Sequence, residues 1–214
     1  MPSVTRAVEI NLPEAVLLAD LYEIAFDLGA AERLCDKVIE LGKQLSRDYF
    51  VEEGLVVAAV VKYGRCFTDG VRLSLKLDDL ATLDADNAAA HDYFIALRHK
   101  FIAHAVNAFE ETYVTASART KDGEMFPITS VHPGQHRMLL TAETAHALVQ
   151  LISGVTAIVK VRIVAEEQKL LAFIQSLPIE TIHSGDLHKP RSMAPNQVHD
   201  SRSRGVHSNK KPKR

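Results

Sequence analysis

Apolar residues recur at intervals of three and four positions along most of the chain up to residue 176, and this spacing constrains the fold more than any other feature. It places the apolar side chains on one face of an α-helix, and that face must be buried against other helices. The pattern predicts four helical segments, at about 13–45, 49–67, 85–111 and 142–176. Gly29 either separates the first segment into two helices or bends a single one. An irregular crossing at 68–83 joins the second segment to the third.

Capping residues mark where several of these helices begin. Asn11 is a candidate N-cap, and Pro13 suits the first turn of the helix that follows it. Asp84 or Asp86 can cap the helix predicted from Ala85, which we expect to be the longest in the chain.

The apolar period changes to two beyond residue 112, which is typical of β-strands. Turn signals at Lys121-Asp122-Gly123 and Pro133-Gly134 separate three alternating segments: 113–119, 125–131 and 136–141. They predict a small β-hairpin or a three-stranded flap over about 113–141. The predicted fold class is therefore all-α, a four- to five-helix bundle over 1–182 with this insert before its last long helix.

The charge distribution sets residues 183–214 apart from the rest of the chain. They hold eight Lys and Arg residues against two Asp, a net charge of +6, so residues 1–182 carry −8 of the total of −2. This segment is also rich in Pro, Ser and His, and it has too few large apolar residues to offset the entropy of ordering. We expect a disordered basic tail, which either contacts nucleic acid electrostatically or only aids solubility.

Cysteine content and hydropathy indicate the cellular compartment of the protein. Cys35 and Cys66 form no CxxC pair, so a disulfide framework is excluded and both are predicted to be buried small hydrophobes. We find no apolar run near the ~20 residues that a membrane span needs, and no signal peptide. These features predict a soluble cytoplasmic protein without membrane contact.

The segment Leu97–His104, LRHKFIAH, carries the most distinctive motif of the chain. An Arg followed by a polar residue, Lys, two apolar residues, Ala and His resembles the HEPN superfamily, in the group linked to abortive phage infection. The resemblance extends over roughly 14–175 through the helical plan, but its specific part is these eight residues.

The resemblance implies metal-independent RNA cleavage by a homodimer, in which two motif helices face each other and form one composite site. It assigns His104 as the acid/base and Arg98 as the phosphate clamp, because His exchanges protons near neutral pH and Arg offers a fixed bidentate charge. His99 stands where the family more often has Asn or Asp, and is a third catalytic candidate. Lys100 and Arg65 join Arg98 as candidate RNA- or phosphate-binding residues. A bacterial defence or toxin–antitoxin role would add a cognate antitoxin as a partner.

Helix geometry provides a structural alternative for the same residues. Arg98 and His104 are six positions apart, and therefore about 120° apart around a straight α-helix. His104 shares a stripe with Leu97 and Phe101, so it could be a buried histidine, with Arg98 paired to an acid. The alternative function is thus a non-catalytic helical interaction or nucleotide-binding module, and the acidic body counts against broad RNA binding.

The remaining candidates for chemistry are weaker. Glu143 and His146 have the spacing of one carboxylate–histidine ligand pair, but a di-iron site needs two such pairs. His132 and His136 lack further ligands nearby, so we expect no metal and no cofactor. Asp92 lies almost in line with His99 and could orient it.

Overall fold

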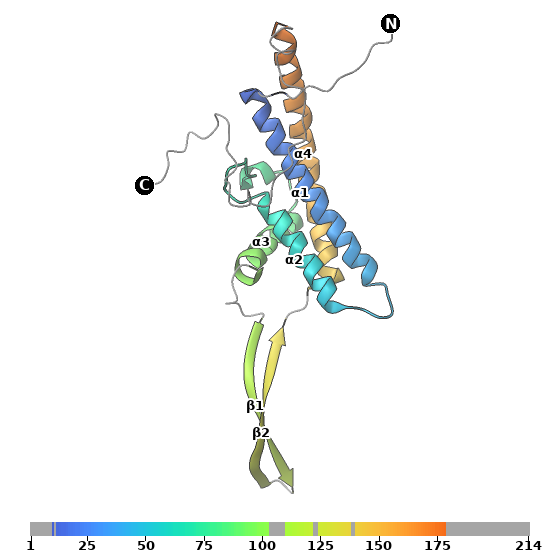
Figure 1. Ribbon diagram of the computed structural model, residues 1–214, viewed down its shortest axis with the longest axis vertical. Coiled ribbons are helices and arrows are strands. Elements are labelled where there is room, and N and C mark those ends of the chain that lie inside the picture. Colours follow the sequence, from blue (N-terminus) through green and yellow to red (C-terminus); the bar gives the residue numbers. More distant parts are fainter. Residues whose placement is uncertain (1–9, 11, 103–109, 122–123, 138–139, 179–214) are drawn as a thin grey trace, which may run out of the picture. The chain divides into compact units, whose positions relative to one another are not determined.

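The computed structural model describes residues 10, 12–102, 110–121, 124–137 and 140–178. Its described part has four α-helices and a two-stranded antiparallel hairpin that precedes the last long helix, which confirms the predicted fold class (Figure 1). The elements are α1 (Pro13–Leu41), α2 (Tyr49–Arg65), the 3₁₀ turn η1 (Leu77–Leu80), α3 (Ala85–Leu97), the π-helical turn η2 (Arg98–Ile102), β1 (Glu110–Lys121), β2 (Glu124–Arg137) and α4 (Ala142–Ser176). The basic segment 183–214 and Asn11 lie outside the described residues.

The chain divides into two compact units. Unit 1 comprises Met1–Leu28, Cys66–Thr82 and Val155–Arg214, and unit 2 comprises Gly29–Arg65 and Leu83–Gly154. Helices α1 and α4 each contribute to both units. The motif segment and the hairpin belong to unit 2.

Helix α1 is continuous through Gly29 and begins at Pro13 as predicted. One buried stripe explains the continuity, because its members follow at intervals of three and four on both sides of the glycine: Leu21, Ile24, Leu28, Ala31, Cys35 and Val38. Burial of this stripe outweighs the roughly 1 kcal/mol helix penalty of a glycine. Cys35 and Cys66 are both free and buried, which confirms their predicted role as small hydrophobes.

The single α-helix predicted over 85–111 is wrong for the described residues beyond Leu97. The Asp84 carboxylate accepts the Asn87 N–H at 2.8 Å and caps α3, but α3 ends at Leu97 and is followed by the π-helical turn. Glu110 already lies in β1, paired with Arg137. Cross-strand pairing with a distant segment overrides the helix propensity of the glutamates, which is a weak local preference. The longest described helix is α4, with 35 residues.

The hairpin is confirmed, but Pro133-Gly134 is not a turn. Pro133 pairs with Val114 and Gly134 with Tyr113, both inside the ladder, while the chain reverses after Lys121. Among the described residues no third strand pairs with either one, so each strand has an outer edge, where a proline is tolerated because no neighbouring strand needs its N–H. Gly134 fits because the Tyr113 ring occupies the space that a Cβ would take. Only two strands form in the described part of the insert, so the three-stranded flap is not observed.

Helix α4 corrects the expectation about apolar runs. Within α4, an eighteen-residue window reaches a mean hydropathy of 1.8, so length and composition alone would suffice to cross a membrane. A third of that window is buried inside the protein. The core helix of a soluble protein meets the same criterion, and α4 contributes Leu148, Ile152 and Val159 to the core.

Candidate functional site

Three of the predicted site residues, Arg98, His99 and Lys100, lie where α3 passes into the π-helical turn. Arg98 still donates its backbone N–H to the carbonyls of Phe94 and Ile95, and it is the first residue of η2. His99 and Lys100 follow in the same turn with exposed side chains. Single π-helical turns are uncommon and are frequent at functional sites, so this irregularity marks the motif independently of its sequence.

Gly64 receives the side chain of Arg98. A Cβ added at Gly64 would overlap the Cδ atom of Arg98, so the aliphatic stem of the arginine lies directly against the backbone of α2. Arg65, the last residue of α2, follows Gly64 and is exposed. The structure therefore brings Arg98, His99 and Lys100 to the end of α2 that carries Arg65.

A buried pair, Tyr63 and His91, lies beside this cluster. The Tyr63 hydroxyl and His91 Nδ1 are 2.7 Å apart, and the two rings meet edge to face. Burial lowers the pKa of His91 below its ordinary value of 6.5, and the nearby charge of Asp92 only partly opposes this. His91 is therefore held as neutral imidazole, in which one ring nitrogen accepts and the other donates.

Sequence reasoning did not single out His91, although the sequence contains the necessary signal. His91 precedes Arg98 by seven residues, which is almost two full helical turns, so both project from the same side of α3. Tyr63 directly precedes Gly64, which receives Arg98. The link between the two helices is a tertiary contact, and only the structure supplies it.

The structure bears on some of the predictions for the motif residues and not on others. Arg98 is half-buried, and no ion pair to it is recorded within the described residues, so the predicted acid partner is not found there. His104 lies outside the described residues. The 120° estimate assumed a continuous α-helix, whereas Arg98–Ile102 has π-helical geometry, so the angle between Arg98 and His104 stays a prediction. Asp92 is exposed, and no hydrogen bond to His99 is recorded in this part of the chain.

The weaker candidates are not brought together. His132 is exposed and lies 2.8 Å from the Ser130 hydroxyl, while the side chain of His136 is outside the description. Glu143 and His146 are both exposed, and the hydroxyl of Thr141 lowers the pKa of Glu143. No group of three or more His, Cys, Asp or Glu side chains suited to a metal ion occurs among the residues that the structure describes.

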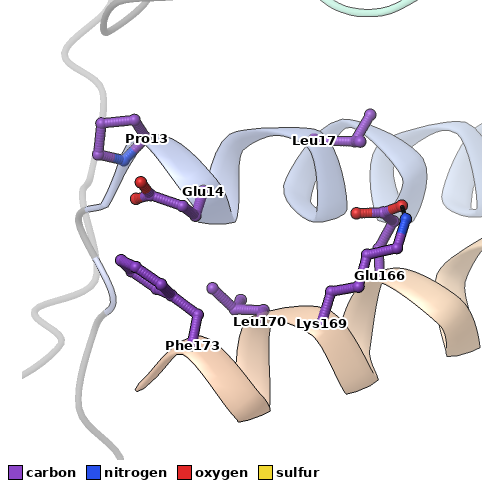
Figure 2. Close-up of a pocket in the computed structure, with 7 residues that line it drawn as sticks. All are labelled: Pro13, Glu14, Leu17, Glu166, Lys169, Leu170 and Phe173. Atoms are coloured by element: carbon purple, nitrogen blue, oxygen red, sulfur yellow. Dashed lines mark hydrogen bonds and ion pairs between the residues drawn. The ribbon is translucent and has the colours of Figure 1, made fainter. Parts of the chain in front are cut away.

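A separate groove lies in unit 1, between the start of α1 and the end of α4. Figure 2 shows its lining, and its volume is about 310 Å³. Leu17, Leu170 and Phe173 form its apolar part, and Lys169 is paired with Glu166 at 2.6 Å. None of the predicted site residues lines it, so it provides no support for the motif chemistry.

The cationic cluster of Arg65, Arg98, His99 and Lys100 offers several positive or protonatable groups to an anion. A guanidinium can bind two phosphate oxygens at once, and a lysine adds a point charge. Comparison with protein-family models, with curated proteins and with solved structures finds no match to this chain. The chemistry of the site therefore has to be argued from its own residues.

Proposed function

We propose that this chain is a metal-independent endoribonuclease of the HEPN type, in which two copies supply Arg98 and His104 to a composite site. The carrying observation is the seating of Arg98 on Gly64 within a π-helical turn, beside Arg65. A stem held against a helix backbone loses less conformational entropy when its guanidinium engages a phosphate.

The proposed reaction uses only side chains of the motif. His104 removes the proton of a ribose 2′-hydroxyl, whose oxygen attacks the adjacent phosphorus while the 5′-oxygen departs with a proton from a second imidazole. Arg98 binds the phosphate oxygens as negative charge develops on them. Lys100 and Arg65 hold the flanking phosphates, and His99 assists the proton transfers.

The biological setting completes the proposal. A cytoplasmic homodimer of this kind would act in bacterial defence or in a toxin–antitoxin pair, with RNA as substrate and an antitoxin as regulator. The two buried free thiols agree with a reducing compartment.

The decisive experiment is cleavage of a labelled RNA by the full chain in excess EDTA. We expect Arg98→Ala to reduce the rate about 10²- to 10³-fold, as for loss of one oxyanion-binding donor, and His104→Ala to reduce it about 10²- to 10⁴-fold. Arg33→Ala removes an exposed arginine of α1 outside the cluster and serves as the matched control. Equal rates in all four proteins, or loss of activity in EDTA alone, would refute the proposal.

A second pair of variants tests the seating of Arg98 rather than its charge. Gly64→Ala forces the Arg98 stem away from α2, so we expect slower cleavage by a protein that remains folded. Gly54→Ala, in the same helix, meets no atom within 4 Å and should cleave at the wild-type rate. RNA binding without cleavage by the wild-type chain would instead support the non-catalytic interaction module.

A further inference from the structure

The outward face of α4 in unit 1 carries a second regular pattern that the core does not use. Its members follow at intervals of four and three over nearly three heptads: Ala157, Val161, Val164, Gln168, Leu171 and Gln175. All six are exposed, and Val161 and Leu171 leave 72% and 56% of their surfaces accessible. We call this set the outer α4 stripe.

The stripe is distinct from the buried face of the same helix. Val155, Val159 and Ile163 are buried and pack into unit 1. The outer stripe repeats with the 3.5-residue period of a helix that packs against another helix. Four of its six residues are apolar, whereas an ordinary solvent-facing helix surface would carry charged or polar residues at most of these positions.

Helix α1 extends the apolar surface beside the stripe. Leu17 and Leu170 line one groove and Tyr22 hydrogen-bonds to Glu167, so α1 and α4 run antiparallel in unit 1. Phe26 follows Tyr22 by one turn and is 73% exposed. Exposed apolar side chains gathered in this way mark interaction surfaces more often than isolated ones.

The charged residues beside the stripe are complementary to those of a second copy of the same helix. Lys160 and Glu167 flank the stripe on the same side and are one heptad apart. In an antiparallel pair of identical helices, this flank meets its own copy, so Lys160 of each chain faces Glu167 of the other. The same register sets Val161 against Val164 of the second copy at the centre. No ion pair of Lys160 is recorded within the described residues.

We propose that the outer α4 stripe binds a second copy of this chain, with the two α4 helices antiparallel and two symmetry-related Lys160–Glu167 pairs beside a valine centre. The argument does not use the motif residues. This contact is separate from the one that would form the composite Arg98–His104 site, because the stripe lies in unit 1 and Arg98 in unit 2. It holds whether or not the protein cleaves RNA. Self-complementarity in charge and in apolar pattern favours an identical partner over an unrelated one.

Charge reversal tests the pairing directly, with sedimentation equilibrium of the full chain measuring the dimer dissociation constant. Lys160→Glu and Glu167→Lys each create two like-charge contacts, and we expect each to weaken the dimer by about tenfold. The double variant restores attraction and should return the constant to within about twofold of the wild type. Arg33→Glu reverses an exposed charge in unit 2 and should have no effect.

Cysteine crosslinking tests the orientation. A mixture of the Val161→Cys and Val164→Cys chains should form a disulfide dimer on mild oxidation, while each chain alone should not. Crosslinking of each chain alone would show a parallel pair and overturn the proposed register. The native Cys35 thiol does not interfere, because burial raises its pKa to about 12.

Other results would overturn the proposal itself. A wild-type chain that stays monomeric, or a dimer that is insensitive to all three charge variants, would show that the stripe does not pair with itself. Binding of the monomer to phosphatidylcholine–phosphatidylglycerol vesicles, lost in Val164→Glu, would assign the stripe to a lipid surface instead.

Discussion

The two parts of unit 2, its helices and its hairpin, use the same types of apolar residue in opposite ways. Val56 of α2 is completely buried, whereas Val114 of β1 leaves 75% of its surface exposed. The helices bury their apolar stripes against one another, while the hairpin has no layer packed over it within the described residues. An isolated two-stranded hairpin is marginally stable in water, so the comparison predicts that the helices carry the stability of this unit.

The hairpin nevertheless has an ordered division of its faces. Across the ladder, Val114 pairs with Pro133 and Ala116 with Val131 on one face. Thr115 pairs with His132 on the other face, and the Thr115 hydroxyl donates to the His132 carbonyl. Its order therefore comes from the backbone ladder and local cross-strand contacts rather than from burial.

The largest expected effect is the loss of an aromatic core residue. Phe94→Ala should lower the free energy of unfolding by about 3–5 kcal/mol, because Phe94 is buried in α3 and its removal leaves a cavity. Tyr113→Ala in the hairpin should lower it by about 1 kcal/mol or less. Urea denaturation measures both, and an equal loss in the two variants would contradict the comparison.

A matched pair of valines sharpens the same point. Val56→Ala should lower the free energy of unfolding by about 2 kcal/mol, and Val114→Ala by no more than about 0.5 kcal/mol. Because the side-chain change is identical, the difference between the two losses of free energy reports the effect of burial alone. If Val114→Ala lowered the free energy of unfolding as much as Val56→Ala, a partner would have to cover the hairpin in solution.

The buried Tyr63–His91 pair predicts a pH dependence in the helical part. Burial lowers the pKa of folded His91, so the unfolded chain binds more protons below about pH 6.5, and stability falls as the pH drops through that value. At higher pH both states hold neutral imidazole and this contribution does not change. In urea denaturation at about pH 7.5 and 5.5, His91→Asn should lose less stability on acidification than the wild type.

Tyr63→Phe provides the control for that measurement. It removes the hydroxyl but keeps the imidazole buried, so the loss of stability on acidification should persist. A His91→Asn protein with the full wild-type pH dependence would assign the effect to other groups.

The smallest expected effect concerns Gly134. A Cβ at this position would overlap the Tyr113 ring, so Gly134→Ala should open the ladder locally and speed hydrogen exchange of hairpin amides. The free energy of global unfolding should remain within about 0.5 kcal/mol of the wild type. Gly54→Ala in α2 should instead stabilise by roughly 0.5–1 kcal/mol, because it meets no neighbour and gains helix propensity.

The sequence by itself determined the helical fold class, the start of α1 at Pro13 and both limits of α4. It narrowed the cap of α3 to Asp84 or Asp86, and the insert to a hairpin or a three-stranded flap. These features follow from the local period of apolar residues and from capping chemistry, which act over a few positions along the chain. The sequence also predicted Arg98, His99, His104, Lys100 and Arg65 as candidate site residues, and this stays a prediction.

Only the tertiary structure decided where α3 ends, that Pro133-Gly134 lies inside a strand, and that Arg98 rests on Gly64 beside the Tyr63–His91 pair. Each of these depends on residues far apart in the sequence, such as Glu110 with Arg137 or Gly64 with Arg98. Strand pairing and close packing between elements outweigh local propensities of a few tenths of a kcal/mol per residue, so no local pattern could have predicted them.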